Sequence, residues 1–156
     1  MAKVLLVDDD KLTVKLYKGK LEDGGLEVET APDGWEALEK IKSGKPDLLL
    51  LDIMMPKMDG LEMMEKMKEN SAMRNIPIML LTNVGDSDED VIRGLEMGAV
   101  SYLIKSSYTP KEVLQKVKEV LSAYSESEKN VPEVKVRVRK EPFMSVKKKV
   151  KKLKKL

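Results

Sequence analysis

Short apolar runs alternate strictly with segments of helical period along most of the chain, and no other feature limits the possible folds as much. The apolar runs predict five strands, at Lys3–Val7, Leu26–Thr30, Asp47–Asp52, Ile76–Leu81 and Val100–Ile104. A segment with helical spacing of apolar residues follows each strand, and glycines or a Thr-Pro pair mark the helix ends. Such βα repetition predicts a parallel, doubly wound α/β sheet with right-handed crossovers.

The apolar residues of these segments predict where the core lies. Leu48–Leu51 is an unbroken apolar run, which is typical of a central strand covered by helices on both faces. In the helix after the first strand, the inner face is predicted from Leu12, Leu16 and Leu21. The last helix is predicted to bury Val113, Val117, Val120 and Leu121.

The composition excludes several kinds of chemistry. The 156 residues include no cysteine and no histidine, so the chain itself supplies no disulfide, thiolate nucleophile or imidazole group. No apolar run approaches the ~20 residues that cross a bilayer, and the first strand begins too early to leave room for a signal peptide. The sequence therefore predicts a cytoplasmic protein whose chemistry depends on carboxylates, hydroxyls and lysines.

Polar residues follow the predicted strands at their carboxyl ends, where the ligand crevice of a doubly wound sheet lies. They are Asp8-Asp9-Asp10, Asp52, Thr82 and Lys105. Crowded carboxylates repel one another unless a hard cation joins them, and an all-oxygen set suits Mg²⁺ and phosphate. The alternative is that Asp8 to Asp10 are helix N-terminal caps, that Asp52 is a solvated strand end and that Lys105 is a surface charge. Their combination at one edge favours a magnesium and phosphate site.

Four segments resemble the receiver domains of two-component response regulators. They are Leu5 to Asp10, Leu51 to Gly60, Leu81-Thr82 and Gly98 to Lys105. The second segment contains Asp-x-x-Met-Pro-x-x-Asp-Gly, the most specific of these motifs. The resemblance covers about residues 2 to 123 and implies a receiver domain at residues 1–123. It implies a flavodoxin-like, doubly wound (βα)5 fold with a five-stranded parallel sheet in the order 2-1-3-4-5.

The resemblance also implies the chemistry of the site. Asp52 would accept a phosphoryl group from a phosphohistidine on a histidine kinase or histidine phosphotransfer protein. Mg²⁺ would be held by Asp8, Asp9, Asp52 and the backbone carbonyl of Met54, with Asp8 acting mainly through a bound water. Lys105 would pair with a phosphoryl oxygen, so that catalysis is mostly positioning and charge neutralisation.

The same resemblance implies a switch and a slow reset. Thr82 would move toward the phosphoryl group and vacate space into which Tyr102 rotates, which creates a new protein-binding surface. A polar side chain two residues after the phosphoacceptor, or two after Thr82, can orient the attacking water, but Met54 and Val84 are apolar. The implied protein is not a conventional enzyme: it catalyses its own phosphorylation and a slow dephosphorylation.

The sequence departs from the receiver pattern after Lys105. Most receivers have proline next, usually joined by a cis peptide, whereas Ser106 follows here. A cis peptide costs ~2.5–4 kcal/mol before a non-proline residue, against ~0.5–1 kcal/mol before proline. The resemblance therefore does not fix the geometry of the loop beside Lys105. It also assigns no role to Asp10.

A strongly basic segment follows the predicted receiver domain. Residues 1–128 contain 17 lysines and arginines against 25 acidic residues, whereas residues 129–156 contain 12 against 2. Residues 124–133 are predicted as a linker, and residues 134–156 combine a strand-like alternation of valine with lysine or arginine and a lysine-rich stretch that has one apolar face. Three interpretations stay open: a solvated segment, a nucleic-acid-binding arm, and an amphipathic helix on an anionic membrane or partner groove.

The leading functional hypothesis is a response regulator of a phosphorelay whose output is protein binding. The alternative is a regulator that binds nucleic acid or an anionic membrane surface through residues 134–156, with phosphorylation as the gate. A haloacid-dehalogenase-like phosphatase would also use an aspartyl nucleophile and Mg²⁺. It needs a second aspartate two residues after the nucleophile, where this chain has Met54, so that class is excluded.

Overall fold

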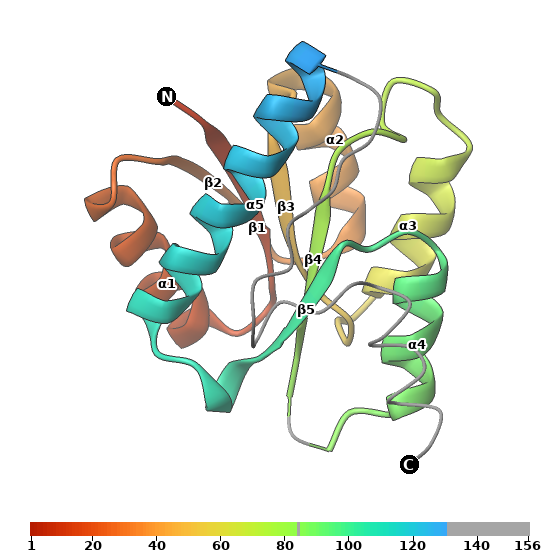
Figure 1. The fold of residues 1–156 in the computed structure, drawn as a ribbon. Coiled ribbons are helices and arrows are strands. Elements are labelled where there is room, and N and C mark those ends of the chain that lie inside the picture. The colour runs from red at the N-terminus through yellow and green to blue at the C-terminus, as the bar shows by residue number, and fades with distance from the viewer. Residues whose placement is uncertain (84, 131–156) are drawn as a thin grey trace.

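The computed structural model describes residues 1–83 and 85–130, which form a sheet flanked by helices (Figure 1). The strands are β1 Lys3–Val7, β2 Glu27–Ala31, β3 Leu48–Asp52, β4 Ile78–Thr82 and β5 Ser101–Ile104. The helices are α1 Lys11–Asp23, α2 Gly34–Gly44, α3 Gly60–Lys68, α4 Asp88–Glu96 and α5 Pro110–Asn130, with a short 3-10 helix, η1, at Lys105–Ser107. Strands and helices alternate as the sequence predicts.

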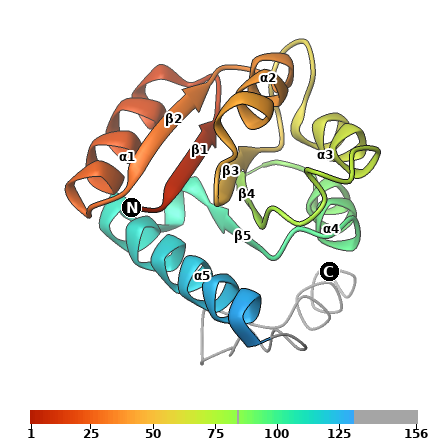
Figure 2. The ribbon, with the colours of Figure 1, turned by 90° about the horizontal axis from the view of Figure 1, so that it is seen from above.

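The sheet has the expected topology. Its order is β2-β1-β3-β4-β5, and every neighbouring pair is parallel. Viewed from above, α1 and α5 cover one face, and α2, α3 and α4 cover the other (Figure 2). All five residues of β3 are buried, which confirms the central position predicted from its unbroken apolar run. The flavodoxin-like fold class is thereby confirmed.

Two apolar cores lie on the two faces of the sheet, because successive strand residues point in opposite directions. In β3, Leu49 and Leu51 join the core beneath α2, α3 and α4, whereas Leu48 and Leu50 join the core beneath α1 and α5. This double cover leaves the carboxyl ends of the strands as the edge at which polar side chains gather.

The prediction for the inner face of α1 is wrong in part. Leu21 is buried, but Leu12 is 64% exposed and Leu16 is 51% exposed. Tyr17 is buried beside Leu21, and Val14 packs against the same core. At about 100° per residue, Val14, Tyr17 and Leu21 form one stripe, and the other two leucines lie on the opposite side of the helix.

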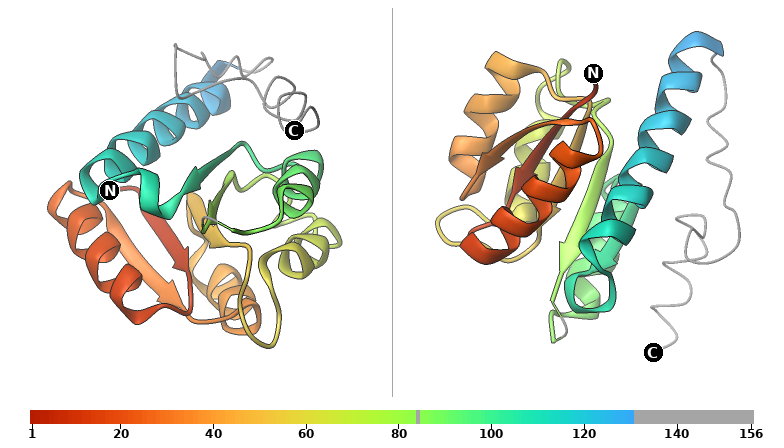
Figure 3. Two further views of the ribbon diagram at one scale, coloured as in Figure 1. Left: turned by 90° about the horizontal axis from the view of Figure 1, so that it is seen from below. Right: turned by 90° about the vertical axis from the view of Figure 1, so that its left-hand side faces the viewer.

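Helix α5 is longer than the sequence suggests. It continues to Asn130, into the segment 124–133 predicted as a linker, and runs along the whole height of the sheet (Figure 3). Two causes extend the helix: Tyr124 packs against the core beneath α1 and α5, and the glutamates and lysine that follow are good helix formers. Residues 134–156 and Val84 lie outside the described residues. Within the described part of the chain, no helix is long and apolar enough to span a bilayer.

Candidate functional site

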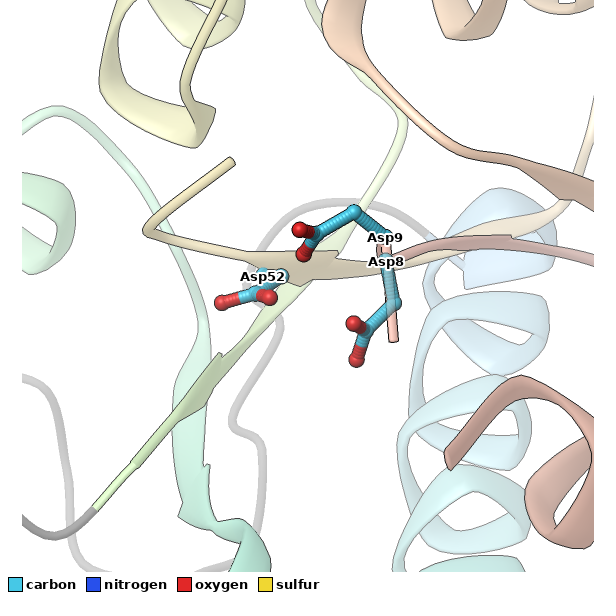
Figure 4. Close-up of side chains that lie close together, drawn as sticks. All are labelled: Asp8, Asp9 and Asp52. Atoms are coloured by element: carbon cyan, nitrogen blue, oxygen red, sulfur yellow. The ribbon is translucent and has the colours of Figure 1, made fainter. Parts of the chain in front are cut away.

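The ends of neighbouring strands bring three aspartates together. Asp8 and Asp9 follow β1, and Asp52 is the last residue of the adjacent β3, so the three side chains lie side by side (Figure 4). One carboxylate oxygen from each residue lies within 4.8 Å of the other two. Asp8 and Asp52 are buried, whereas Asp9 is exposed. The crowding expected at this edge is therefore present.

Lys105 supplies the positive charge of the cluster. Its Nζ lies 2.7 Å from Asp8 Oδ2 and 3.2 Å from Asp52 Oδ2, so one ammonium group bridges two buried carboxylates. The ammonium donates a hydrogen bond to Asp52 Oδ2 and forms the shorter ion pair with Asp8 Oδ2. Burial acts to lower the pKa of Lys105, but its contacts with Asp8 and Asp52 raise it above the ordinary value. Lys105 therefore stays charged.

The electrostatic environment makes Asp52 hard to ionise. Burial raises the pKa of Asp52 to about 7, with a further contribution from the negative charge of Asp8, and Lys105 opposes this shift only in part. A positive charge bound nearby would lower this pKa and thereby favour the ionised carboxylate. A bound cation would therefore stabilise the ionised form of Asp52.

The loop after β3 makes close backbone contacts with Asp52. The Met54 N–H donates to Asp52 Oδ1 at 3.1 Å. Gly60 approaches so closely that a Cβ at this position would lie 2.5 Å from the Asp52 carbonyl oxygen. Asp59 and Glu62 form a reciprocal capping box that begins α3 beside this contact. Together these contacts fix the loop that carries Met54 over the cluster.

Asp10 has a structural role instead of a place in the cluster. Its side chain caps α1, accepting hydrogen bonds from the Leu12 N–H at 3.1 Å and from the Thr13 hydroxyl at 2.7 Å. The Thr13 hydroxyl lowers the pKa of Asp10, with help from the backbone N–H groups of Leu12 and Thr13. The cap interpretation of the aspartate run is therefore correct for this one residue.

The two predicted switch residues occupy different positions on neighbouring strands. Thr82 is buried at the end of β4, one residue beyond the pair Asp52 and Leu81, so it stands next to the cluster. Tyr102 is partly buried on β5 and packs against the core beneath α2, α3 and α4. Burial raises the pKa of Tyr102, and the charge of Asp88 at the start of α4 adds to this shift. Tyr102 therefore lies beside α4.

The donor set fits a hard divalent cation. Asp8, Asp9 and Asp52 offer only oxygen atoms, and the exposed Asp9 leaves the cluster open to solvent. Mg²⁺ prefers such ligands, keeps several waters and is held by few protein groups. Burial and, after it, the negative charge of Asp8 raise the pKa of Asp52, and a bound cation would offset both effects.

Comparison with known proteins decides the family. Residues 4–118 match the response regulator receiver domain. The chain belongs to this family. The receiver is 43% identical over 119 residues to the alkaline phosphatase synthesis transcriptional regulatory protein PhoP of Bacillus subtilis, a match that covers 76% of this chain and 48% of PhoP. It is 43% identical over 104 residues to the response regulator PleD of Caulobacter vibrioides, covering 67% of this chain and 23% of PleD.

Solved receiver structures share the fold. The chemotaxis response regulator CheY4 of Vibrio cholerae superposes with a TM-score of 0.69 at 36% identity, covering 77% of this chain and 98% of CheY4. A CheY-like receiver from Methanospirillum hungatei gives a TM-score of 0.73 at 33% identity, covering 81% of this chain and 98% of that one. By contrast, the chain spans about half the length of the first curated relatives, 48% of PhoP and 57% of a CpxR homolog of Haemophilus influenzae.

The close packing of Gly60 is the feature of the receiver site that sequence reasoning missed. The motif contains Asp59-Gly60, and Asp59-x-x-Glu62 is a recognisable capping signal. That signal locates the start of α3, but the contact with the Asp52 carbonyl follows only from the path of the folded loop. A Gly60→Ala substitution would have to move this loop and, with it, the Met54 N–H.

Proposed function

We propose that this receiver is a phosphorelay component that accepts a phosphoryl group on Asp52 from a phosphohistidine of a histidine kinase or histidine phosphotransfer protein. One observation carries the proposal: Asp52, at the end of the central strand, lies beside two further aspartates and hydrogen bonds to the ammonium of Lys105. These 156 residues contain no histidine, so the donor imidazole lies outside them. The response regulators among its relatives support this assignment.

The reaction is an in-line displacement at phosphorus. A carboxylate oxygen of Asp52 forms the new P–O bond as the P–N bond to the donor imidazole breaks, and the imidazole keeps the electron pair of that bond. Lys105 Nζ, which contacts two carboxylates before the reaction, is within reach of a phosphoryl oxygen on Asp52 and would bind it. Asp8, Asp9, Asp52 and the Met54 carbonyl would hold Mg²⁺, which neutralises phosphoryl charge when bound.

The output is a change at the α4–β5 surface. Thr82 stands next to Asp52 at the end of β4 and would donate its hydroxyl hydrogen to a phosphoryl oxygen. Its movement makes room for Tyr102, which is partly buried on the neighbouring strand beside Asp88 of α4. Inward rotation of Tyr102 converts a charge at Asp52 into a new protein-binding surface. The target protein is recognised through that surface.

Phosphorylation by a small donor tests this proposal. With Mg²⁺ and acetyl phosphate, the protein should gain the mass of one phosphoryl group, and EDTA should suppress the gain because Asp8 and Asp52 then repel the donor. Intact-protein mass spectrometry at timed intervals measures the gain. A protein that stays unmodified with Mg²⁺ and excess donor would contradict the proposed function.

A second candidate function is phosphorylation-gated binding of nucleic acid through the basic segment. Residues 129–156 carry 12 lysines and arginines against 2 acidic residues, and PhoP is a transcriptional regulatory protein by name. Replacing the seven lysines between 147 and 155 by glutamine leaves phosphorylation intact under both functions. Salt-sensitive DNA binding that these replacements abolish favours the second function. Vesicles with anionic lipids, used in place of DNA, test the membrane alternative.

Mg²⁺ is expected to raise the midpoint of thermal unfolding. A ligand that binds only the folded state adds about 2.7 kcal/mol at a hundredfold excess over its Kd. Asp9→Ala should lose most of this rise, and because Asp9 is exposed the variant should fold normally. Asp23→Ala, which removes an exposed aspartate at the end of α1, is the matched control and should respond like the wild type. An undiminished response of Asp9→Ala would place the metal elsewhere.

The same measurement should depend on pH in a defined direction. Without metal, the pKa of about 7 lets folded Asp52 keep a proton that the unfolded chain releases near pH 4, so stability should fall as pH rises from about 4 to about 7. Mg²⁺ requires the ionised carboxylate, so its stabilising effect should grow over the upper part of this range. Asp52→Asn should remove this contribution.

A further inference from the structure

Lys105 stands on a turn that has little to hold it locally. It is the first residue of η1, a three-residue 3-10 helix between β5 and α5 with no side-chain cap. Ser106 and Ser107 complete the turn and are exposed. Ser106, and not a proline, follows Lys105, so no ring fixes the backbone there. The position of the ammonium group therefore depends on what anchors the two ends of the turn.

The end that precedes Lys105 is anchored by the sheet. β5 pairs in parallel with β4, and Ile104, the last strand residue, is opposite Thr82. The sheet thus places the backbone of Ile104 beside the cluster. It does not determine the path that the chain takes after Lys105.

The end that follows Lys105 is anchored by Tyr108. This residue has an extended backbone, with φ −132 and ψ 136, and its partly buried side chain packs against the core beneath α1 and α5. The Nζ of Lys116, on the second turn of α5, lies 4.9 Å from the centroid of the Tyr108 ring. A cation at this distance from an aromatic face is attracted by the ring quadrupole. The pair therefore ties the end of the turn to α5.

Lys116 is an unusual residue for its position. It is only 8% exposed and shares the inner side of α5 with Val113, Val117 and Val120. Burial lowers its pKa, and the charges of Glu119 and Glu112 act in the opposite direction. A methionine here would pack without the cost of removing a charge from water. The ammonium of Lys116, in turn, lies against the Tyr108 ring.

Helix α5 is itself a firm support for this pair. Thr109 and Glu112 form reciprocal hydrogen bonds: the Thr109 N–H donates to Glu112 Oε1 at 2.9 Å, and the Glu112 N–H donates to Thr109 Oγ1 at 3.2 Å. This capping box begins the helix directly after Tyr108. The chain from Tyr108 onward is therefore fixed, and only the short turn separates it from Lys105.

We propose that Tyr108 and Lys116 are positioning residues, which hold the turn after β5 so that Lys105 Nζ reaches Asp8 and Asp52. The proposal deepens the proposed function and rests on it, because the positioned group is the one that would bind the phosphoryl oxygen. The pair restricts the backbone of the turn, as a proline after Lys105 would. It acts on the reaction only through Lys105.

Substitutions in the full chain test this role. Tyr108→Leu and Lys116→Met should each slow phosphorylation by acetyl phosphate about tenfold at saturating Mg²⁺, since small displacements of a charged group are costly in rate. Tyr108→Phe keeps the ring, Lys116→Arg keeps the cation, and both should stay near the wild-type rate. The affinity for Mg²⁺ should not change, because Asp8 and Asp9 directly follow β1 and Asp52 ends β3, away from the turn.

A double-mutant cycle separates positioning from general damage. In a Lys105→Met background, Tyr108→Leu and Lys116→Met should cause no further loss of rate, because the group that they position is gone. If they still slow the reaction about tenfold there, or weaken Mg²⁺ binding in parallel, they act on the domain as a whole and the proposal is wrong.

The ammonium signal of Lys105 in the NMR spectrum gives a readout that does not need phosphorylation. It is assigned by its absence in Lys105→Met and should shift in Tyr108→Leu and Lys116→Met, but not in Tyr108→Phe. A signal that none of the variants alters overturns the positioning role. A responsive signal in a protein that acetyl phosphate never modifies supports the positioning of Lys105 and overturns the proposed function instead.

Discussion

Asp52→Asn is expected to abolish phosphorylation by acetyl phosphate, with a loss of at least about 100-fold in rate. Asparagine has nearly the shape of aspartate, but its amide is a poor nucleophile toward phosphorus. The variant should fold at least as stably as the wild type without metal, because it removes the buried charge that faces Asp8. Mass spectrometry measures the first expectation and thermal unfolding the second.

Asp47→Asn is the matched control for this experiment. Asp47 lies just before β3, at the other end of the same strand, and its Oδ2 accepts a hydrogen bond from the Lys3 N–H at 2.8 Å. Its replacement should leave phosphorylation unchanged. Equal labelling of Asp52→Asn and wild type would mean that another carboxylate is the acceptor, and Asp9, as the exposed member of the cluster, would be the first to replace.

The sheet topology could be predicted because it rests on features that neighbouring residues show. The apolar run Leu48–Leu51 predicts a strand buried on both faces. The parallel arrangement of the strands follows from the helix that comes after each of them. The meeting of Asp8, Asp52 and Lys105 follows in turn, since parallel strands end at one edge. The sequence pattern does not predict the distances within the site. The 2.7 Å and 3.2 Å contacts of Lys105 with Asp8 and Asp52 depend on how the turn after β5 folds.

Other features depend on packing between distant segments and could not be predicted. Leucine is more often buried than exposed, so Leu12 and Leu16 are predicted as core residues, whereas Tyr17 fills the inner face of α1. A lysine such as Lys116 is normally taken as solvated, and only the fold brings it to Tyr108. The pKa of Asp52, about 7, likewise results from burial, which no local pattern reveals.

The lifetime of the phosphorylated state is expected to depend on Met54. Its N–H donates to Asp52 Oδ1, and the residue is 52% exposed, so a polar side chain at this position could hold a water molecule near the acceptor. A thioether does not position a water molecule for attack as an amide or carboxylate can. The wild-type protein should therefore lose its phosphate slowly, which suits a sustained signal.

Met54→Asn and Met54→Glu should shorten this lifetime about tenfold or more, since a positioned polar group that orients or deprotonates the nucleophile is worth a large factor in rate. Met54→Leu is the matched control and should leave it unchanged. A polar residue in place of Val84 is expected to act in the same direction.

After removal of acetyl phosphate, the decay of the phosphorylated mass measures the lifetime, and the midpoint of unfolding with Mg²⁺ checks that metal binding is retained. A wild-type lifetime of seconds that neither polar substitution alters would show that water reaches Asp52 by a path that these side chains do not control.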